Sequence, residues 1–201
     1  LLADPKVTIV ECVTSTSRAE NLTHALTLSD VKLEDFALIA DADNLPCPNC
    51  ISYLSTVLER SPALCCGVQG IVLQRGCSFV SLISNGTVWL FGVAIGPAFE
   101  VFLGTCLYTG SACMMRTDIL RQYKLRNRYL DDMDFLWRVA CDGYHLKSFV
   151  LAQMHELPIA GFYAFCRQRY RYVMGVEQCN YEHLRLMCTK PRLLLWYLYV
   201  Y

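Results

Sequence analysis

The chain alternates short apolar runs with segments in which apolar residues recur at helical spacing. Four runs rich in β-branched and apolar residues predict strands, at 7–13, 36–40, 63–73 and 146–151. Three segments with an apolar face predict helices, at 19–28, 51–58 and 132–141. Gly143 suits the end of the last helix. Strands that alternate with helices predict one α/β domain, a Rossmann-like mostly parallel sheet flanked by helices.

Two further apolar stretches have the composition of membrane segments. Residues 77–99 carry no charge and are long enough to span a bilayer. Their glycines and Pro97 disfavour a continuous helix, so we expect a buried or interfacial segment rather than a span. The run 193–201 begins like a membrane helix but rises only about 14 Å. We therefore expect this sequence to be an excerpt of a longer membrane protein.

Composition narrows the class of function. The 201 residues are 54% hydrophobic and 18% charged, with a mean hydropathy of +0.29. Such an apolar chain collapses into a core, which excludes disorder, and it is typical of a protein that works near a membrane. The 18 basic and 18 acidic residues cancel. No positive excess is available to neutralise a phosphate backbone, so we expect no nucleic-acid partner.

The twelve cysteines are scattered from Cys12 to Cys188 and do not have the spacing of a disulfide framework. One CxxC motif, Cys47–Cys50, precedes the adjacent pair Cys65 and Cys66. Zinc binding needs a second pair of ligands, and redox chemistry needs a strand-then-helix context like that of thioredoxin. Without either, buried thiols in a reducing compartment are the favoured interpretation.

Asp41-Ala42-Asp43 directly follows the apolar run 36–40. Ligands of open α/β sheets bind at the carboxyl ends of the strands, where these two carboxylates are expected. Their spacing allows both to approach one Mg²⁺ or Mn²⁺ ion, whose other positions can take diphosphate oxygens. The alternative is a solvated acidic turn.

A second acidic group, Asp131-Asp132-Met133-Asp134, stands at the start of the predicted helix 132–141. Carboxylates at a helix N-terminus can simply favour the positive end of the helix dipole. Crowded carboxylates also repel one another, so one of them can retain enough proton affinity to act as a general base.

The third group alternates arginine with aromatic residues over 167–172. Guanidinium groups bind phosphate, and aromatic faces stack on a sugar or a base. The alternative is a partly solvated helix face.

Taken in order, these three groups resemble the signature of the processive family-2 glycosyltransferases, the cellulose, chitin and hyaluronan synthases. That signature is D-x-D, then T/E-E-D, then Q-x-x-R-W. Its counterparts here are Asp41–Asp43, Leu130–Asp132 and Gln168–Tyr172. Minor motifs of the family also have counterparts, at 18–26, 109–116, 138–144 and 156–158. The resemblance covers about 7–175.

The resemblance implies a GT-A catalytic domain over 1–178 that transfers a sugar from a nucleotide-diphosphate donor to an acceptor hydroxyl and inverts the anomeric carbon. It makes Asp132 the general base. Asp43 is implied to hold Mg²⁺ or Mn²⁺ and the diphosphate, with Asp41 beside it and Arg18 on the donor side. The implied acceptor platform consists of Gln168, Arg169, Arg171, Tyr172, Gly110 and Asp131.

The chain departs from the family pattern in three places. Tyr172 replaces tryptophan, which changes the area available for sugar stacking, and Asp131 replaces glutamate, which shortens a supporting carboxylate. The family's opening strand, which grips the nucleotide base, is expected upstream of Leu1. We therefore expect weak or no activity from a chain limited to these residues.

The resemblance also implies partners and location. It favours a UDP-sugar over a GDP-sugar, a glycan or lipid-linked acceptor, and a role in polysaccharide or glycan synthesis. Residues 179–201 are expected to lead into a transmembrane helix of a multi-pass protein whose catalytic domain faces the cytosol. Two alternatives stay open: an inactive relative that acts as a binding or scaffold module, and a membrane-embedded structural protein with spans at 77–99 and 193–201.

Overall fold

The computed structural model describes residues 17–27, 35–76, 78–159, 161–190, 192 and 194. The predicted strand 7–13 and most of the run 193–201 lie outside these residues. In chain order the elements are α1 (Arg18–Thr27), β1 (Phe36–Ile39), β2 (Leu45–Pro46), α2 (Cys50–Glu59), β3 (Cys65–Gln74), α3 (Phe79–Trp89), the π-helix η1 (Leu90–Ile95), α4 (Gly96–Leu103), β4 (Cys113–Arg116), α5 (Thr117–Tyr123), α6 (Asp131–Cys141), β5 (His145–Glu156) and α7 (Phe162–Cys188).

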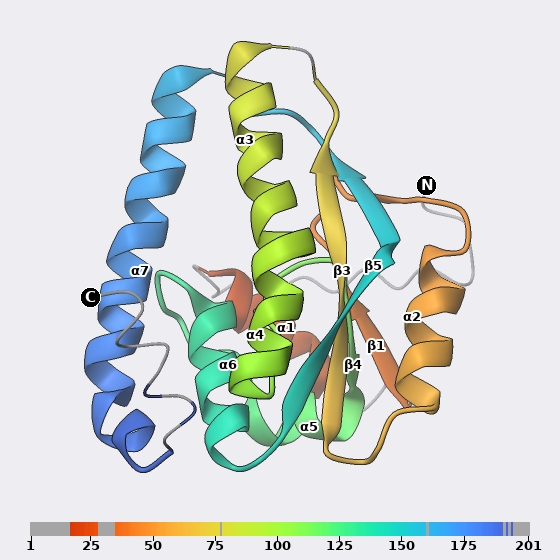
Figure 1. Cartoon of the computed structure of the whole chain (residues 1–201), viewed down its shortest axis with the longest axis vertical. Coiled ribbons are helices and arrows are strands. Elements are labelled where there is room, and N and C mark those ends of the chain that lie inside the picture. Colours follow the sequence, from red (N-terminus) through yellow and green to blue (C-terminus); the bar gives the residue numbers. More distant parts are fainter. Residues whose placement is uncertain are drawn as a thin grey trace.

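The described strands form one sheet in the order β1-β4-β3-β5-β2, with helices on both faces (Figure 1). This confirms the α/β class, but the sheet is mixed rather than mostly parallel. β3 and β5 pair in parallel, whereas the β1·β4, β3·β4 and β2·β5 pairs are antiparallel. The reversal of β4 follows from its entry point. The segment before β4 reaches the middle of β3, where the N–H of Gly70 donates to the carbonyl of Ala112. From there β4 pairs with residues 69 to 67 and therefore runs antiparallel to β3.

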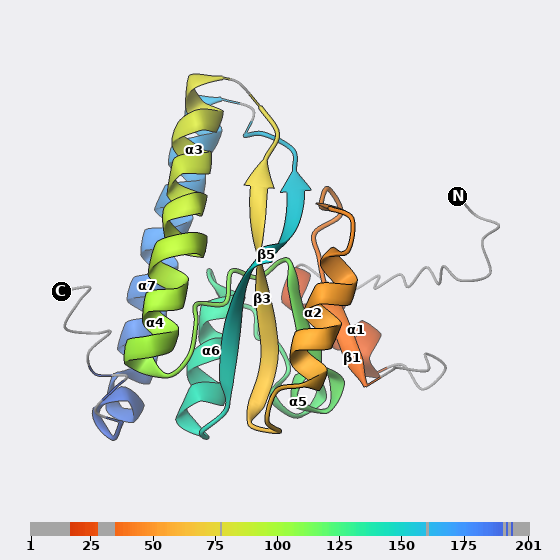
Figure 2. The ribbon, with the colours of Figure 1, turned by 45° about the vertical axis from the view of Figure 1, so that its right-hand side comes forward.

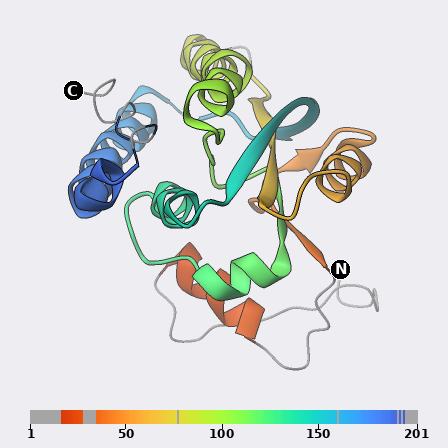
Figure 3. The same ribbon diagram turned by 60° about the horizontal axis from the view of Figure 1, so that its bottom comes forward.

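The two faces of the sheet carry separate clusters of buried side chains. α2 packs on one face with Leu54 and Leu58, and α1, α5 and α6 cover the other (Figures 2 and 3). Neighbouring strand residues point to opposite faces, so Cys65 belongs to the α2 side and Cys66 to the α6 side. These two cysteines therefore do not supply the CxxC motif with a second pair of thiolates for a four-cysteine zinc site.

Residues 79–103 form a continuous helical run, contrary to the prediction that glycine and proline would interrupt it. The π-helix η1 keeps the helical run continuous through the glycine at position 92. The N–H of Gly96 donates to the carbonyl of Phe91, five residues earlier, and Pro97 lies in the first turn of α4, where its missing N–H costs little. The run has a mean hydropathy of 1.6, and only 11% of its most apolar window is buried. The segment is therefore long and apolar enough to span a membrane, and it is not a buried core helix.

The remaining helical predictions are confirmed by α1, α2 and α6, and Gly143 follows α6 with φ +92°. The strand predicted over 146–151 is longer, because β5 continues to Glu156. The predicted domain boundary after residue 178 falls inside α7, which runs unbroken from Phe162 to Cys188. α7 packs against α6 and lies beside α3 (Figures 1 and 2).

Candidate active-site cleft

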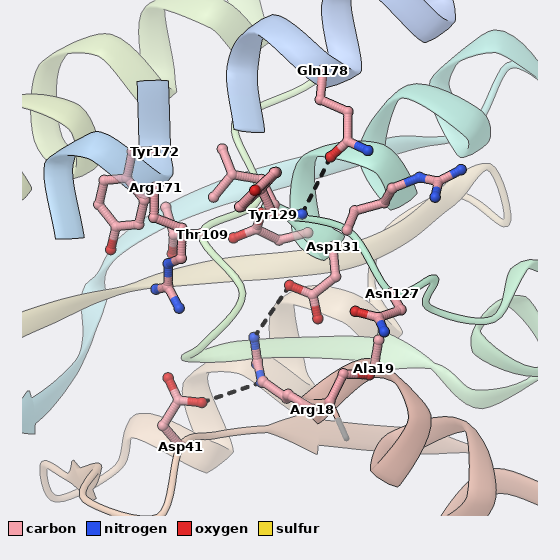
Figure 4. Close-up of a pocket in the computed structure, with 14 residues that line it drawn as sticks. Arg18, Ala19, Asp41, Thr109, Asn127, Tyr129, Asp131, Arg171, Tyr172 and Gln178 are labelled. Carbon is pink, nitrogen blue, oxygen red and sulfur yellow. Dashed lines mark hydrogen bonds and ion pairs between the residues drawn. The ribbon is translucent and has the colours of Figure 1, made fainter. Parts of the chain in front are cut away.

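A cleft of about 750 Å³ lies where the start of α1, the end of β1, the segment before α6 and the middle of α7 meet (Figure 4). It brings together residues from four separate parts of the predicted site, namely Arg18, Asp41, Asp131, Asp132, Arg171 and Tyr172. The other lining residues are Ser17, Ala19, Thr109, Asn127, Arg128, Tyr129, Leu130 and Gln178.

Asp132 stands at the start of α6 in the wall of this cleft. Its Oδ1 accepts a hydrogen bond of 2.7 Å from the N–H of Met133. Burial, and after it the charge of Asp131, raises the pKa of Asp132 from 3.8 to about 7, although the N–H of Met133 and the Arg18 guanidinium act in the opposite direction. Such a carboxyl binds a proton near neutral pH, which suits a general base.

Gly110 makes room for this carboxylate. A Cβ at Gly110 would lie 2.8 Å from Oδ2 of Asp132 and 2.8 Å from a guanidinium nitrogen of Arg18. Its φ of +81° is also in the left-handed region, which favours glycine. Gly110, placed on the acceptor platform by the resemblance, therefore lies directly beside the candidate base.

Arg18 links the two acidic groups across the cleft. Its Nε lies 3.3 Å from Oδ1 of Asp41, and its Nη1 lies 3.9 Å from Oδ1 of Asp131 (Figure 4). Its Nη2 donates to the carbonyl of Gly110. Ser17 precedes the helix α1 that carries Arg18, and its hydroxyl accepts from the N–H of Glu20. The start of α1 thus fixes one guanidinium between both carboxylate groups.

The D-x-D segment follows β1, as the sequence predicts, and its two aspartates face different surroundings. The N–H of Asp41 donates to the hydroxyl of Ser111 at 3.2 Å, and Asp41 lines the cleft. Asp43 is exposed and is not among the lining residues. Burial raises the pKa of Glu156, and the charges of Asp43 and then Asp41 add to the rise, while a hydrogen bond from Gln74 opposes it. These three carboxylates are hard oxygen donors of the kind that Mg²⁺ and Mn²⁺ prefer.

A buried glutamine that no predicted motif included holds the segment 109–111 in place. Gln69 in β3 is 5% exposed, and its Nε2 donates to the carbonyls of Gly70 and Ser111 at 2.8 Å each. Its Oε1 accepts from the N–H of Thr109. The sequence carries a signal for this role, because Gln69 interrupts an otherwise apolar strand and a buried amide needs partners.

Residues of α7 supply the opposite wall, but only two of the four predicted platform residues of this helix reach the cleft. Arg171 and Tyr172 line it, and the Arg171 guanidinium lies 5.7 Å from the Tyr172 ring centroid. Arg169 instead turns toward α3, where its Nη2 donates to the hydroxyl of Ser84 at 3.4 Å. The Arg169 guanidinium also lies over the Tyr172 ring, 5.5 Å from its centroid, so Arg169 supports Tyr172 without lining the cleft. Gln168 is half-buried and does not line the cleft.

The segment just before α6 provides lining residues that no sequence motif marked. The N–H of Tyr129 donates to Oε1 of Gln178 in α7 at 3.3 Å. The guanidinium of Arg128 pairs with Glu182, also in α7, at 3.1 Å. Their positions immediately before Asp131 were the only sequence signal. α7 therefore fastens the segment that leads to the candidate base.

Sequence comparison identifies the family. The sequence model of glycosyl transferase family group 2 matches residues 36–201. The chain belongs to this family. No curated protein matches the sequence. Among solved structures, the mannosyltransferase PcManGT from Pyrobaculum calidifontis, in complex with GDP-Man and Mn²⁺, matches with a TM-score of 0.63 and 18% identity. The match covers 92% of this chain and 50% of that one, so the chain spans half the length of this relative.

The structural likeness shows that this family-2 chain has the GT-A fold.

A second acidic cluster of the glycosyltransferase must be distinguished from its D-x-D segment. Asp134, Glu182 and His183 place one potential metal ligand each within 4.8 Å of one another. The two oxygens of buried Asp134 are already used, since one accepts from Arg138 at 2.9 Å and the other lies 2.9 Å from Nε2 of His183. Asp134 of α6 is thus held by Arg138 of the same helix and by His183 of α7, so this cluster joins α6 to α7.

Proposed function

We propose that this family-2 chain transfers a sugar from a nucleotide-diphosphate donor to an acceptor hydroxyl with inversion of the anomeric carbon. The observation that carries the proposal is Asp132, a carboxylate with a pKa of about 7 in a cleft that also presents arginines. Family membership and the GT-A fold support the same reaction class. The Q-x-x-R-Y sequence at Gln168–Tyr172 supports a processive enzyme of polysaccharide or glycan synthesis.

In this reaction the Asp132 carboxylate accepts the proton of the acceptor hydroxyl. The acceptor oxygen attacks the anomeric carbon, and the bond from that carbon to the diphosphate breaks on the opposite side. The bonding electron pair leaves with the nucleotide diphosphate. Because attack and departure take place on opposite faces, the anomeric carbon is inverted. Arg18 or Arg171, both of which line the cleft, can offset the charge that grows on the leaving group.

The segment that follows β1 offers candidate ligands for a divalent cation, with Asp41 in the lining of the cleft and Asp43 exposed beyond it. Asp41 and Asp43 offer carboxylate oxygens beside Glu156, and such oxygens are the usual ligands of Mg²⁺ and Mn²⁺. When bound, such an ion neutralises the diphosphate and assists its departure. We assign the metal to Asp43, and Asp41 and Arg18 to the donor side. The structural relative is in complex with GDP-Man, whereas the sequence resemblance favours a UDP-sugar, so both nucleotides belong in the test.

The test is a binding titration of UDP and of GDP, with and without Mn²⁺, on the native chain and on Asp43→Ala. We expect binding that needs the metal and is lost in Asp43→Ala. Glu59→Ala, which removes an exposed carboxylate of α2 outside the cleft, is the matched control and should bind like the native chain. Metal-independent binding, or full binding by Asp43→Ala, would refute the assignment. No binding by any variant would leave two explanations, an inactive relative or a nucleotide pocket that needs the family's opening strand, and repeating the titration with that strand added would separate them.

We also propose that the chain works at a membrane surface with the cleft on the cytosolic side, toward a glycan or lipid-linked acceptor. The helical run of α3, η1 and α4 presents a mostly apolar surface in which large side chains are 41–77% exposed. Its exposed members are Phe79, Leu82, Ile83, Trp89, Leu90, Phe91, Val101 and Phe102.

Flotation with phospholipid vesicles tests this second proposal. Phe102→Glu places a charge on the α4 surface and should reduce the fraction that floats. Ile51→Glu changes a side chain of α2 that is 51% exposed on the opposite side of the sheet, and should leave flotation unchanged. Equal flotation of both variants and the native chain would contradict the proposal.

A further inference from the structure

The CxxC motif has the structural context that redox chemistry requires. β2 ends at Pro46, Cys47 follows it, and Cys50 is the first residue of α2. The loop that precedes α2 stands at the upper end of this helix, next to β5 (Figure 2). A CxxC motif between a strand and the N-terminus of a helix is the arrangement in which thiols exchange disulfides. The structure therefore meets the condition for a redox role that the sequence alone left open.

The local backbone brings the two cysteines within reach of a disulfide. The N–H of Cys50 donates to the carbonyl of Cys47 at 3.1 Å, which closes a four-residue turn. Asn49 has φ 67° and ψ 0°, the conformation of the third residue of a type II turn, and Pro48 stands at the second position, which proline favours. Such a turn holds its end Cα atoms within about 7 Å, and a disulfide needs about 4.4–6.8 Å.

The two thiols differ in accessibility. Cys50 is 1% exposed, whereas Cys47 is half-buried. Burial raises the pKa of the Cys50 thiol, and the nearby Cys47 sulfur adds to the rise. Cys47 is therefore the thiol that an external disulfide can reach, and Cys50 is placed to attack only after Cys47 has reacted.

We propose that Cys47 and Cys50 form a reversible disulfide by exchange with a low-molecular-weight disulfide such as glutathione disulfide. The Cys47 thiolate attacks one glutathione sulfur, and the other glutathione leaves as a thiolate that takes up the proton from Cys47. The Cys50 sulfur then attacks the Cys47 sulfur, loses its proton, and releases the second glutathione. The protein loses two electrons and two protons, and one glutathione disulfide becomes two glutathione thiols.

This site is separate from sugar transfer and does not depend on it. It lies on the same segment as the D-x-D motif, four residues beyond Asp43. The N–H of Cys47 donates to the carbonyl of Gln153 in β5 at 3.0 Å, which fixes this end of the segment to the sheet. The disulfide therefore forms in a backbone that is already held in place.

The test equilibrates the full chain in glutathione redox buffers, followed by alkylation and peptide mapping by mass spectrometry. We expect a peptide that links Cys47 to Cys50, short of two hydrogen atoms, and its loss on reduction with dithiothreitol. Cys50→Ser should accumulate one glutathione on Cys47, whereas Cys47→Ser should carry no glutathione on Cys50. Cys166→Ser, which removes an exposed lone thiol of α7, is the control and should form the same link.

The proposal fails if native protein forms no Cys47–Cys50 link in the oxidising buffer. It also fails if glutathione accumulates on Cys50 in Cys47→Ser, because that would reverse the order of attack. Far-ultraviolet circular dichroism of each variant shows whether it is folded, and Cys47→Ala or Cys50→Ala replaces a serine variant that does not fold.

Discussion

Replacing Asp132 with asparagine is expected to stabilise the folded chain at neutral and alkaline pH. Burial and the charge of Asp131 raise the pKa of Asp132 from 3.8 to about 7, so the folded state disfavours the ionised carboxylate. At about 1.36 kcal/mol for each pKa unit, the ionised group lowers the free energy of unfolding by about 4 kcal/mol. This is an upper limit, because the side chain is partly open to the cleft.

The pH window follows from the same two pKa values. Between about pH 4 and pH 7 the folded state binds this proton more tightly than the unfolded state does, so the stability of the native chain falls as pH rises. The amide introduced by Asp132→Asn carries no charge, and its oxygen could still accept from the N–H of Met133. The stability gained by this substitution should therefore be small near pH 4, grow with pH, and become constant above about pH 7.

Urea unfolding followed by tryptophan fluorescence measures this difference, since Trp137 is fully buried. The series should run from about pH 4 to about pH 8, with Glu59→Gln as a control that removes an exposed carboxylate. A gain that is independent of pH, or a loss of stability at about pH 8, would refute the argument that the surroundings of Asp132 disfavour its charge. The same variant should have lost transfer activity.

Three further outcomes follow from the structure. The rate of sugar transfer by the native chain should fall below about pH 7 as Asp132 becomes protonated. Asp131→Asn should move this fall to lower pH, because it removes a like charge next to Asp132. A pH–rate profile of both proteins checks this. Gly175→Ala should lower the free energy of unfolding by about 1–3 kcal/mol in thermal or urea unfolding, because its Cβ would lie 2.4 Å from Cγ of Leu130. Asp134→Ala should lower the free energy of unfolding by about 3–5 kcal/mol in urea unfolding, because it leaves the largely buried Arg138 guanidinium without its carboxylate partner.

The spacing of apolar residues in the sequence correctly predicted the helices whose apolar face packs on the sheet. α2 and α6 appear where the spacing places them, because their apolar faces pack on opposite sides of the sheet. The same reasoning failed over 79–103, where glycine and proline suggested a break. Helix propensity penalises Gly92 and Pro97. Gly92 lies in the π-helix η1, where a Cβ would lie 3.3 Å from Ile71, and Pro97 lies in the first turn of α4. This contact joins the helical run to Ile71 of β3, so the sequence around Gly92 alone does not predict it.

The candidate site shows a similar division. Motif order placed Arg18, Asp41 and Asp132 together, and the cleft contains all three. Motif order also grouped Arg169 with the platform, but in a helix neighbouring positions point in different directions, and Arg169 faces α3. Gln178 was missed because it lies in α7 beyond the motif and reaches the cleft by helix packing, which no single segment of sequence encodes.

The charges in the cleft and beside it explain why the proposed donor and metal should bind together. At the donor end, Asp41 and Asp43 lie near the Glu156 carboxylate, and all three repel a diphosphate. Arg18 only partly offsets them, because its guanidinium is already shared between Asp41 and Asp131. A divalent cation would offset most of this negative charge and would supply positions for phosphate oxygens. At the other end Arg171 lines the cleft, and its guanidinium can face the leaving diphosphate without an ion. The carboxylates at the donor end thus make the proposed donor binding depend on metal, whereas the proton affinity of Asp132 is set by burial and by Asp131.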